Sequence, residues 1–267
     1  MPHVSARTPS LVASVIGMLS VSTAALGSAI VPVSQVRSAS ADSFVVLGPT
    51  SEQDIVDIVA PTLAPFSIAF DTNASLANGT ASFDVSQDSA FLPFGFVAEG
   101  AAASTSTIVA PGGFCYSVGS SSATVTFTVA AGTAYRLGAA LHADANGQTK
   151  LSLSGSGGVV VSESLIGDDE SVRVAGTLSG GTWTLHVSSF SSTSLTNPGT
   201  MVDDAAFTLF LSTSPSAADL DLDGSVNASD LGLLLGAWGP CDACIADIDA
   251  SGTVDAADLA ALLGDWS

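Results

Sequence analysis

Lysine and arginine are scarce in this chain of 267 residues. Five of them stand against 25 aspartates and glutamates, which gives a formal net charge of −20. Such a charge repels phosphate backbones and anionic lipids, so nucleic acid and membrane surfaces are expected to be poor partners. Bound cations would neutralise part of the excess. A highly soluble surface adapted to salty surroundings is the alternative explanation, and the two are compatible.

The sequence also lacks a recognisable catalytic set. After the first 29 residues the only histidines are His142 and His186. We expect His186 to be exposed on the polar side of a strand, and His142 to lie near Asp144 beside a hairpin turn. The acidic stretch 168–170 is predicted to lie in a loop, and the pair 203–204 in a solvated turn. Serines are so abundant that a Ser-His-Asp pattern would carry no information, so we expect a non-catalytic protein.

Only one apolar run is long, and it lies near the N-terminus. Leu11 to Leu26 follows a short leader with one arginine and one histidine, and precedes the small residues Gly27-Ser28-Ala29. The run is shorter than the roughly 20 residues that a spanning helix needs. The pattern is typical of a signal peptide over residues 1–29, with an uncleaved N-terminal anchor as the alternative. We therefore expect a secreted protein, extracellular or at the cell surface, with no membrane insertion after cleavage.

Cysteine is limited to three residues. Cys241 and Cys244 are separated by two residues, whereas Cys115 stands alone. Export to an oxidising compartment favours a disulfide between the close pair, and Cys115 is expected to be a buried free thiol. A thioredoxin-like redox site would require an α/β context, and a zinc site would require two more soft ligands nearby.

Residues 42–213 have a uniform composition rich in Ser, Thr, Gly, Ala and Val, without a sustained helical period. Short alternating runs recur between glycine-rich turns, and the clearest are 66–70, 81–85, 123–129, 150–153, 171–174, 182–187 and 206–211. In 182–187 the odd positions are apolar and the even ones polar, which is the period of a half-buried strand. Many short strands without helices predict a mainly β fold, an antiparallel β-sandwich similar to a jelly roll. The stretch 127–211 diffusely resembles the sandwich modules of exported bacterial surface proteins.

A short linker of small residues, 214–218, precedes a tail of different character. Residues 219–267 contain ten acidic residues and no lysine or arginine, and they repeat with a 28-residue period. Each repeat begins with a twelve-residue segment that has oxygen-bearing side chains at positions 1, 3 and 5, glycine at 6 and aspartate at 12. Calcium prefers six to eight oxygen ligands, and a tightly curled loop with glycine at its sixth position lets alternate side chains converge.

The segments therefore predict two calcium ions, one in each loop. The expected ligands, including the backbone carbonyl at position 7 and a direct or water-mediated contact at position 9, are Asp219, Asp221, Asp223, Ser225, Asn227 and Asp230 in loop 1, and Asp247, Asp249, Ser251, Thr253, Asp255 and Asp258 in loop 2. Loop 2 has Ser251 where loop 1 has Asp223. We therefore expect loop 1 to bind more tightly, although Asp255 could compensate in part.

Each loop is followed by a short amphipathic segment. Leucine and tryptophan recur at i, i+3, i+4 and i+7, as Leu231, Leu234, Leu235 and Trp238 and again as Leu259, Leu262, Leu263 and Trp266. Helices of roughly nine residues are unstable alone, so the two stripes are expected to pack together once the acidic loops are neutralised. Val226 and Val254 are expected to pair across a short β-bridge between the loops. Folding of the tail should depend on calcium.

The double pattern at 219–267 resembles the type I dockerin, in which each calcium loop precedes one helix. The resemblance implies attachment to a cohesin-like or cell-surface protein. It is weaker at loop positions 10 and 11, where Ala228-Ser229 and Ala256-Ala257 replace the usual hydroxyl pair, and the helices lack basic residues. Calcium binding is thus better supported than the cohesin partner.

Together these features predict a secreted, non-catalytic calcium-binding protein, with a β-sandwich interaction domain and a dockerin-like tail for attachment or assembly. One alternative is a carbohydrate-binding component of a polysaccharide-degrading complex, with a polysaccharide partner. Another is a small extracellular hydrolase with a dockerin, since glycosidases use paired carboxylates.

Overall fold

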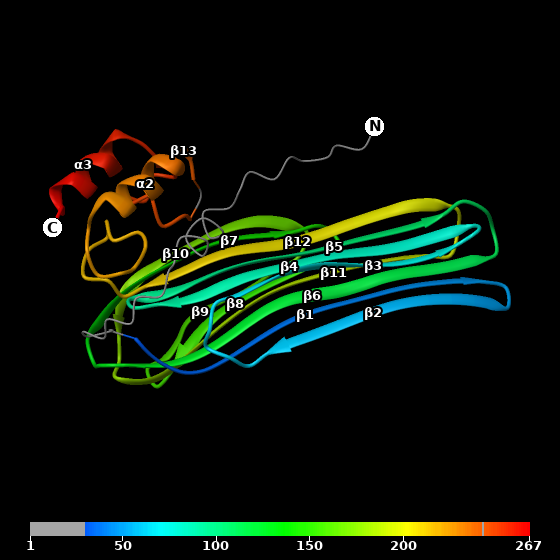
Figure 1. Ribbon diagram of the computed structural model, residues 1–267, viewed down its shortest axis with the longest axis horizontal. Coiled ribbons are helices and arrows are strands. Elements are labelled where there is room, and N and C mark those ends of the chain that lie inside the picture. Colours follow the sequence, from blue (N-terminus) through cyan, green and yellow to red (C-terminus); the bar gives the residue numbers. More distant parts are fainter. Residues whose placement is uncertain (1–29, 242) are drawn as a thin grey trace.

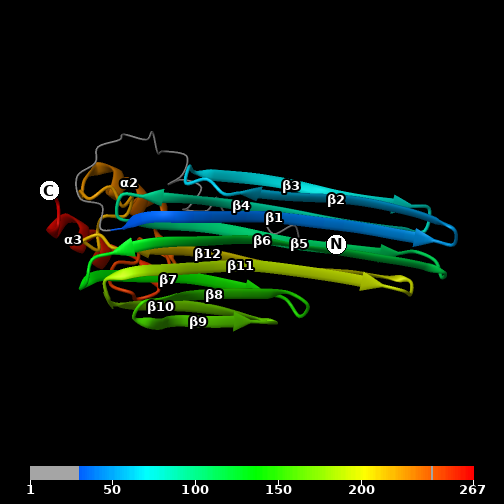
Figure 2. The same ribbon diagram turned by 90° about the horizontal axis from the view of Figure 1, so that it is seen from below.

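The computed structural model describes residues 30–241 and 243–267, so the predicted signal peptide lies outside the described residues. Two six-stranded antiparallel sheets face each other along most of the chain (Figures 1 and 2). One sheet has the order β2-β1-β6-β11-β8-β9 and the other β10-β7-β12-β5-β4-β3. This confirms a mainly β, antiparallel sandwich.

The strands are longer than the alternating runs in the sequence indicated. Their bounds are β1 Val31–Leu47, β2 Thr50–Ala60, β3 Phe66–Leu76, β4 Gly79–Leu92, β5 Gly95–Ile108, β6 Gly113–Val129, β7 Thr133–Ala143, β8 Gln148–Gly155, β9 Gly158–Leu165, β10 Asp168–Leu178, β11 Gly181–Leu195 and β12 Gly199–Ser212. Strand β1 begins before residue 42, where the sequence placed the start of the sandwich. Ser, Thr and Ala are frequent among the added positions, and where they alternate the sequence carries little hydropathy contrast.

Two acidic stretches that were predicted as loop and turn are in strands. Asp168, Asp169 and Glu170 open β10 and pair with the end of β7. Asp203 and Asp204 lie within β12, and the Asp203 side chain is fully buried. Both predictions were wrong because the strands continue through charged residues, with partners on the neighbouring strands.

The core of the sandwich changes in character along its length. Next to the tail it is filled by large apolar side chains such as Phe127, Trp183 and Leu185. Towards the turn that joins β11 to β12, hydroxyl groups meet across the two sheets, as between Ser104 and Ser191, whose Oγ atoms are 2.6 Å apart. The pairs Ser104–Ser191 and Ser106–Thr193 are tolerated there because their buried hydroxyls hydrogen-bond to each other.

The tail forms two short helices, α2 Ala228–Gly236 and α3 Ala256–Gly264, and two short strands, β13 Gly239–Pro240 and β14 Thr253–Val254. It lies at one end of the sandwich (Figure 1). The two parts share one hydrophobic cluster, in which Leu92, Val97 and Phe210 of the sandwich pack with tail residues such as Leu220 and Leu234. Among the described residues, no helix is long and apolar enough to cross a membrane.

Candidate metal centre

The two acidic loops of the tail adopt the same backbone. At position 4, Leu222 and Ala250 have φ of 58° and 61°, and at position 6, Gly224 and Gly252 have φ of 98° and 88°. Residues other than glycine rarely adopt a positive φ. Its recurrence at equivalent positions shows that both loops curl inward in the same way.

The curl brings carboxylates together in each loop. Ligand oxygens of Asp219, Asp221 and Asp223 lie within 4.8 Å of one another in loop 1. In loop 2, where position 5 is a serine, the converging group is Asp247, Asp249 and Asp258, at positions 1, 3 and 12. The converging groups are hard oxygen donors, and the aspartates at positions 1 and 12 of both loops are buried. Such a donor set fits Ca²⁺, whose positive charge would offset the repulsion between the carboxylates.

The charge in loop 1 is poorly compensated. Burial, together with the charges of Asp230 and Asp223, raises the pKa of Asp221 to about 7. Burial also raises the pKa of Asp219, against the hydrogen bond that its carboxylate accepts from the Gly224 amide. A carboxylate with a raised pKa is destabilised in its charged form, and a bound cation would remove that penalty.

The residues at positions 9 and 12 cap the N-termini of the two helices. Asn227 and Asp255 are the N-caps of α2 and α3, and their side chains accept hydrogen bonds from the amides of Ser229 and Ala257. Asp230 and Asp258 complete capping boxes by accepting from the amides of Asn227 and Asp255. The residues expected at position 9 as direct or water-mediated ligands therefore stabilise the helix starts.

Position 7 and the predicted bridge differ between the loops. In both loops the amide at position 7 donates to the side chain at position 5, Ser225 to Asp223 and Thr253 to Ser251. In loop 2 the Thr253 carbonyl also accepts a hydrogen bond from the Ser251 hydroxyl at 3.0 Å. The expected bridge between Val226 and Val254 is absent among the described residues, because Val254 pairs with Gly239. The Val226 carbonyl instead accepts a hydrogen bond from the Ser267 amide at 3.1 Å. Both valines are buried, so their apolar character reflects packing and does not report pairing between them.

The helices bury only part of each leucine and tryptophan stripe. Leu234 and Leu262 are fully buried, and Leu231 and Leu259 are partly buried. The remaining four side chains are about half exposed: Leu235, Trp238, Leu263 and Trp266. The prediction that the complete stripes pack together was wrong, because part of the apolar surface used to bury the tail comes from the sandwich.

The sandwich holds loop 1 through the turn between β4 and β5. The Phe94 amide donates to the Leu222 carbonyl at 3.1 Å. Gly95 and Gly224 both lie where a Cβ atom would collide, the first with Leu211 and Leu222 and the second with the Phe94 ring. These close approaches fix the loop against the sandwich, and they could not be inferred from the repeat itself.

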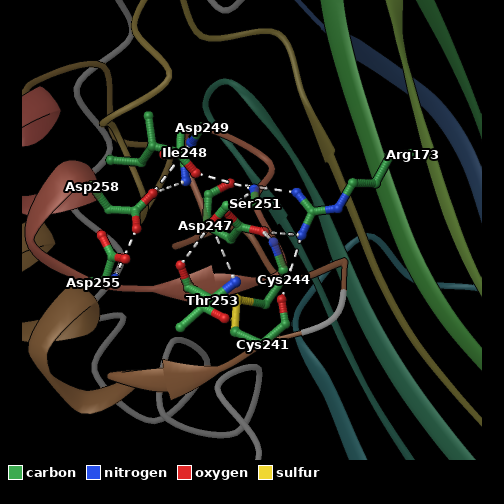
Figure 3. The surroundings of a disulfide bond; sticks show 11 residues. Arg173, Cys241, Cys244, Asp247, Ile248, Asp249, Ser251, Thr253, Asp255 and Asp258 are labelled. Carbon is green, nitrogen blue, oxygen red and sulfur yellow. Dashed lines mark hydrogen bonds and ion pairs between the residues drawn. A yellow bond between two sulfur atoms is a disulfide. The ribbon is translucent and has the colours of Figure 1, made fainter.

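An arginine of the sandwich holds loop 2. Arg173 on β10 donates from Nη2 to Asp247 Oδ2 at 2.5 Å and also reaches the carbonyls of Asp247 and Cys241 (Figure 3). On the adjacent β7, Arg136 donates to the Ala217 carbonyl at 2.9 Å, just before loop 1. The sequence did not predict that Arg136 and Arg173 contact the tail. The chain has only five lysines and arginines, so each of them was a candidate partner for the acidic loops.

Cys241 and Cys244 form a disulfide with their Cα atoms 5.7 Å apart, next to the Arg173 contact (Figure 3). Cys115 is a free and fully buried cysteine in the sandwich. The disulfide closes the connector between α2 and loop 2, so it restricts the chain where the sandwich contacts the second loop.

The predicted non-catalytic histidines have specific partners. His186 is half-buried and shares a hydrogen bond of 2.9 Å with the Thr124 hydroxyl, so the expectation of simple exposure was wrong. His142 lies between Asp169 and Asp204, which approach its two ring nitrogens. The sequence pointed to Asp144 as its neighbour, but it could not indicate partners on β10 and β12.

No protein-family model matches the chain, and no curated protein matches it. Among solved structures, a tailspike protein 4 domain of bacteriophage CBA120 matches with a TM-score of 0.19 and 12% identity, over 48% of this chain and 19% of that chain. TmCBM61 in complex with β-1,4-galactotriose matches with a TM-score of 0.17 and 17% identity, over 39% and 73%. An exo-β-1,3-galactanase from Phanerochaete chrysosporium matches with a TM-score of 0.18 and 10% identity, over 62% and 67%. The strand pairing of the chain itself defines the sandwich.

Proposed function

We propose that this chain is an exported, non-catalytic calcium-binding protein whose dockerin-like tail attaches a β-sandwich to a partner protein. The observation that carries the proposal is the convergence of three carboxylates in each of two loops with the same backbone. Two Ca²⁺ ions, one in each loop, would neutralise charge that the tail itself cannot compensate, since it contains no lysine or arginine.

The proposed attachment surface is the exposed part of the two helical stripes. Leu235 and Trp238 follow loop 1, and Leu263 and Trp266 occupy the equivalent positions after loop 2. Large exposed apolar side chains are typical of protein-binding surfaces. We infer a cohesin-like domain as the occupant, because the apolar face belongs to a tail with the dockerin loop pattern.

Calcium dependence is tested on the full chain by hydrogen exchange with and without a chelator. We expect the amides of α2 and α3 to be protected in calcium and to lose protection in the chelator. A ligand present at 100 times its Kd stabilises the folded state by about 2.7 kcal/mol. The amides of β6 and β11 are the internal control, because they lie in the sandwich. Equal protection of the helices in both conditions would contradict the calcium proposal.

Attachment is tested separately with a purified cohesin domain encoded in the same genome. We expect binding in calcium that is lost in a Trp238→Ala/Trp266→Ala variant and kept in a Phe190→Ala variant. Phe190 is an exposed aromatic of the sandwich and serves as the matched control. If no binding occurs while the helices still require calcium, the attachment proposal fails and the calcium proposal stands.

Carbohydrate binding by the sandwich is the second candidate. An open hollow of about 490 Å³ lies over β3, β4 and β5, and its lining includes Asp71, Asp84 and Ser86. Asp71 and Asp84 are paired directly across β3 and β4. Two neighbouring carboxylates in a hollow could accept hydrogen bonds from sugar hydroxyls. A pull-down with β-1,4-galactan would test this candidate, with Asp71→Asn/Asp84→Asn expected to abolish retention.

A further inference from the structure

His142 is a partly exposed residue near the end of β7. Asp169 is directly opposite His142 on β10. Asp204 lies on the other neighbour, β12, and Asp144 follows β7 in the turn before β8. Three strands and one turn thus bring a single imidazole and three carboxylates together.

The two ring nitrogens have different surroundings. Nδ1 is 2.5 Å from Asp169 Oδ1. Nε2 is 3.1 Å from Asp204 Oδ1 and 3.9 Å from Asp144 Oδ1. Ligand atoms of His142, Asp144 and Asp204 all lie within 4.8 Å of one another. One nitrogen is therefore oriented by a single carboxylate, while the other faces two.

The turn that carries Asp144 is fixed by β12. The buried carboxylate of Asp203 accepts a hydrogen bond from the Asn146 amide at 2.8 Å, and the Asp144 amide donates to the Asp204 carbonyl at 2.8 Å. Asp203 also accepts from Ser191 of β11. Asp144 is consequently held beside Asp204 by contacts that do not involve the imidazole.

Space is available beside the imidazole. An open hollow of about 500 Å³ is lined by His142 and Asp169 together with Glu170, Ser171 and Thr208. This hollow borders the Asp169 side of the ring. On the other side, the side chains of His142, Asp144 and Asp204 are 39%, 51% and 44% exposed, so a group bound at His142 Nε2 would be accessible to water.

We propose that His142 Nε2, Asp144 and Asp204 bind a divalent transition-metal ion of the zinc type, with Asp169 as a positioning residue. Asp169 accepts the hydrogen bond from Nδ1–H, which leaves the lone pair of Nε2 for the metal. A mixed nitrogen and oxygen donor set suits Zn²⁺, whereas Ca²⁺ prefers the all-oxygen loops of the tail. Three protein ligands leave one coordination position open. The site would be independent of the proposed attachment function.

The competing explanation is a protonated His142 that bridges Asp169 and Asp204 through two charged hydrogen bonds, with no metal bound. Zinc titration of the full chain in saturating calcium distinguishes the two, because calcium occupies the loops. We expect one zinc ion per chain, its binding lost in His142→Gln and unchanged in His186→Gln. His186 is the control, because it lies on β11 and bonds to Thr124.

Two further variants keep the test decisive if His142→Gln fails to fold. Asp204→Asn removes a ligand charge and should weaken zinc binding, while Asp169→Asn should lower the affinity by about 10- to 100-fold. Nitrogen NMR of the imidazole should show zinc shifting Nε2 in the wild type. The proposal is overturned by zinc affinity that is the same in wild type, His142→Gln and Asp204→Asn, or by no zinc binding in saturating calcium.

Discussion

The sandwich and the tail solve the problem of charge in opposite ways. The sandwich core contains apolar side chains and pairs of hydroxyls such as Ser104 and Ser191. Its buried carboxylate, Asp203, accepts hydrogen bonds from the Asn146 amide and the Ser191 hydroxyl. The tail concentrates ten acidic residues in its two repeats and their connector, without any lysine or arginine. Two positively charged side chains of the sandwich, Arg136 and Arg173, hydrogen-bond to the linker and to loop 2. The sandwich should therefore be stable without bound ions, whereas we expect the tail to need both calcium and the sandwich.

The largest expected effects come from matched leucine deletions in the two regions. Leu185 and Leu234 are both buried, one in the sandwich and one in α2. Each change to alanine should lower the free energy of unfolding of its own region by about 2–5 kcal/mol. Hydrogen exchange measured at increasing denaturant concentration would report the stability of the sandwich and of the tail separately. Leu185→Ala should act equally with and without calcium, and Leu234→Ala should act only when calcium holds the tail folded.

Removing the arginine contact tests whether the sandwich supports loop 2. Arg173→Met deletes a charged hydrogen bond to the buried Asp247, an interaction that contributes roughly 1.5–3 kcal/mol. Hydrogen exchange of the segment from Cys241 to Gly252 should become faster by a matching amount. Lys150→Met is the control, because Lys150 lies on β8 in the sandwich. Unchanged exchange in Arg173→Met would show that the tail does not require this contact.

The two loops can be ranked by single ligand changes. Asp223→Ala should weaken calcium binding to loop 1 by at least about one decade, or 1.4 kcal/mol, because Asp223 belongs to the converging group. Asp255→Ala should mainly destabilise α3, because Asp255 is its N-cap. Asp255→Asn, which keeps the cap, is the matched control. Competitive calcium titration would measure all three, and a greater loss of affinity from Asp255→Ala would reverse the predicted order.

The smallest expected effect is the pH dependence of the calcium-free tail, because solvent screening at the partly exposed Asp221 reduces what its pKa shift contributes to stability. Burial and neighbouring negative charges raise the pKa of Asp221 to about 7 in the folded state, above its unfolded value. A raised folded pKa means that the stability is fully present below the unfolded pKa and is lost as the pH rises through about 7. In chelator, tail protection should therefore fall with rising pH. Saturating calcium should remove this trend, and a chelator profile that rises with pH would contradict it.

The class of the fold and the two acidic loops could be predicted because both leave local signals. Alternation in the segment 182–187 indicates a strand, and glycine at the sixth position of a repeated acidic segment indicates a tight loop. The ends of the strands were harder to predict from the sequence. Asp168 and Asp203 are residue types typical of turns, and only their partners on β7 and β11 explain why they lie in strands.

By itself, the sequence determined the alternation of the sandwich, the repeat of the tail and the surplus of negative charge, since each depends on residues near one another in the chain. Tertiary structure decided which groups meet across strands: Arg173 with Asp247, Phe94 with loop 1, and His142 with Asp169 and Asp204. Those contacts join residues far apart in the sequence. Their geometry follows from strand register and from the docking of the tail, which no local pattern encodes.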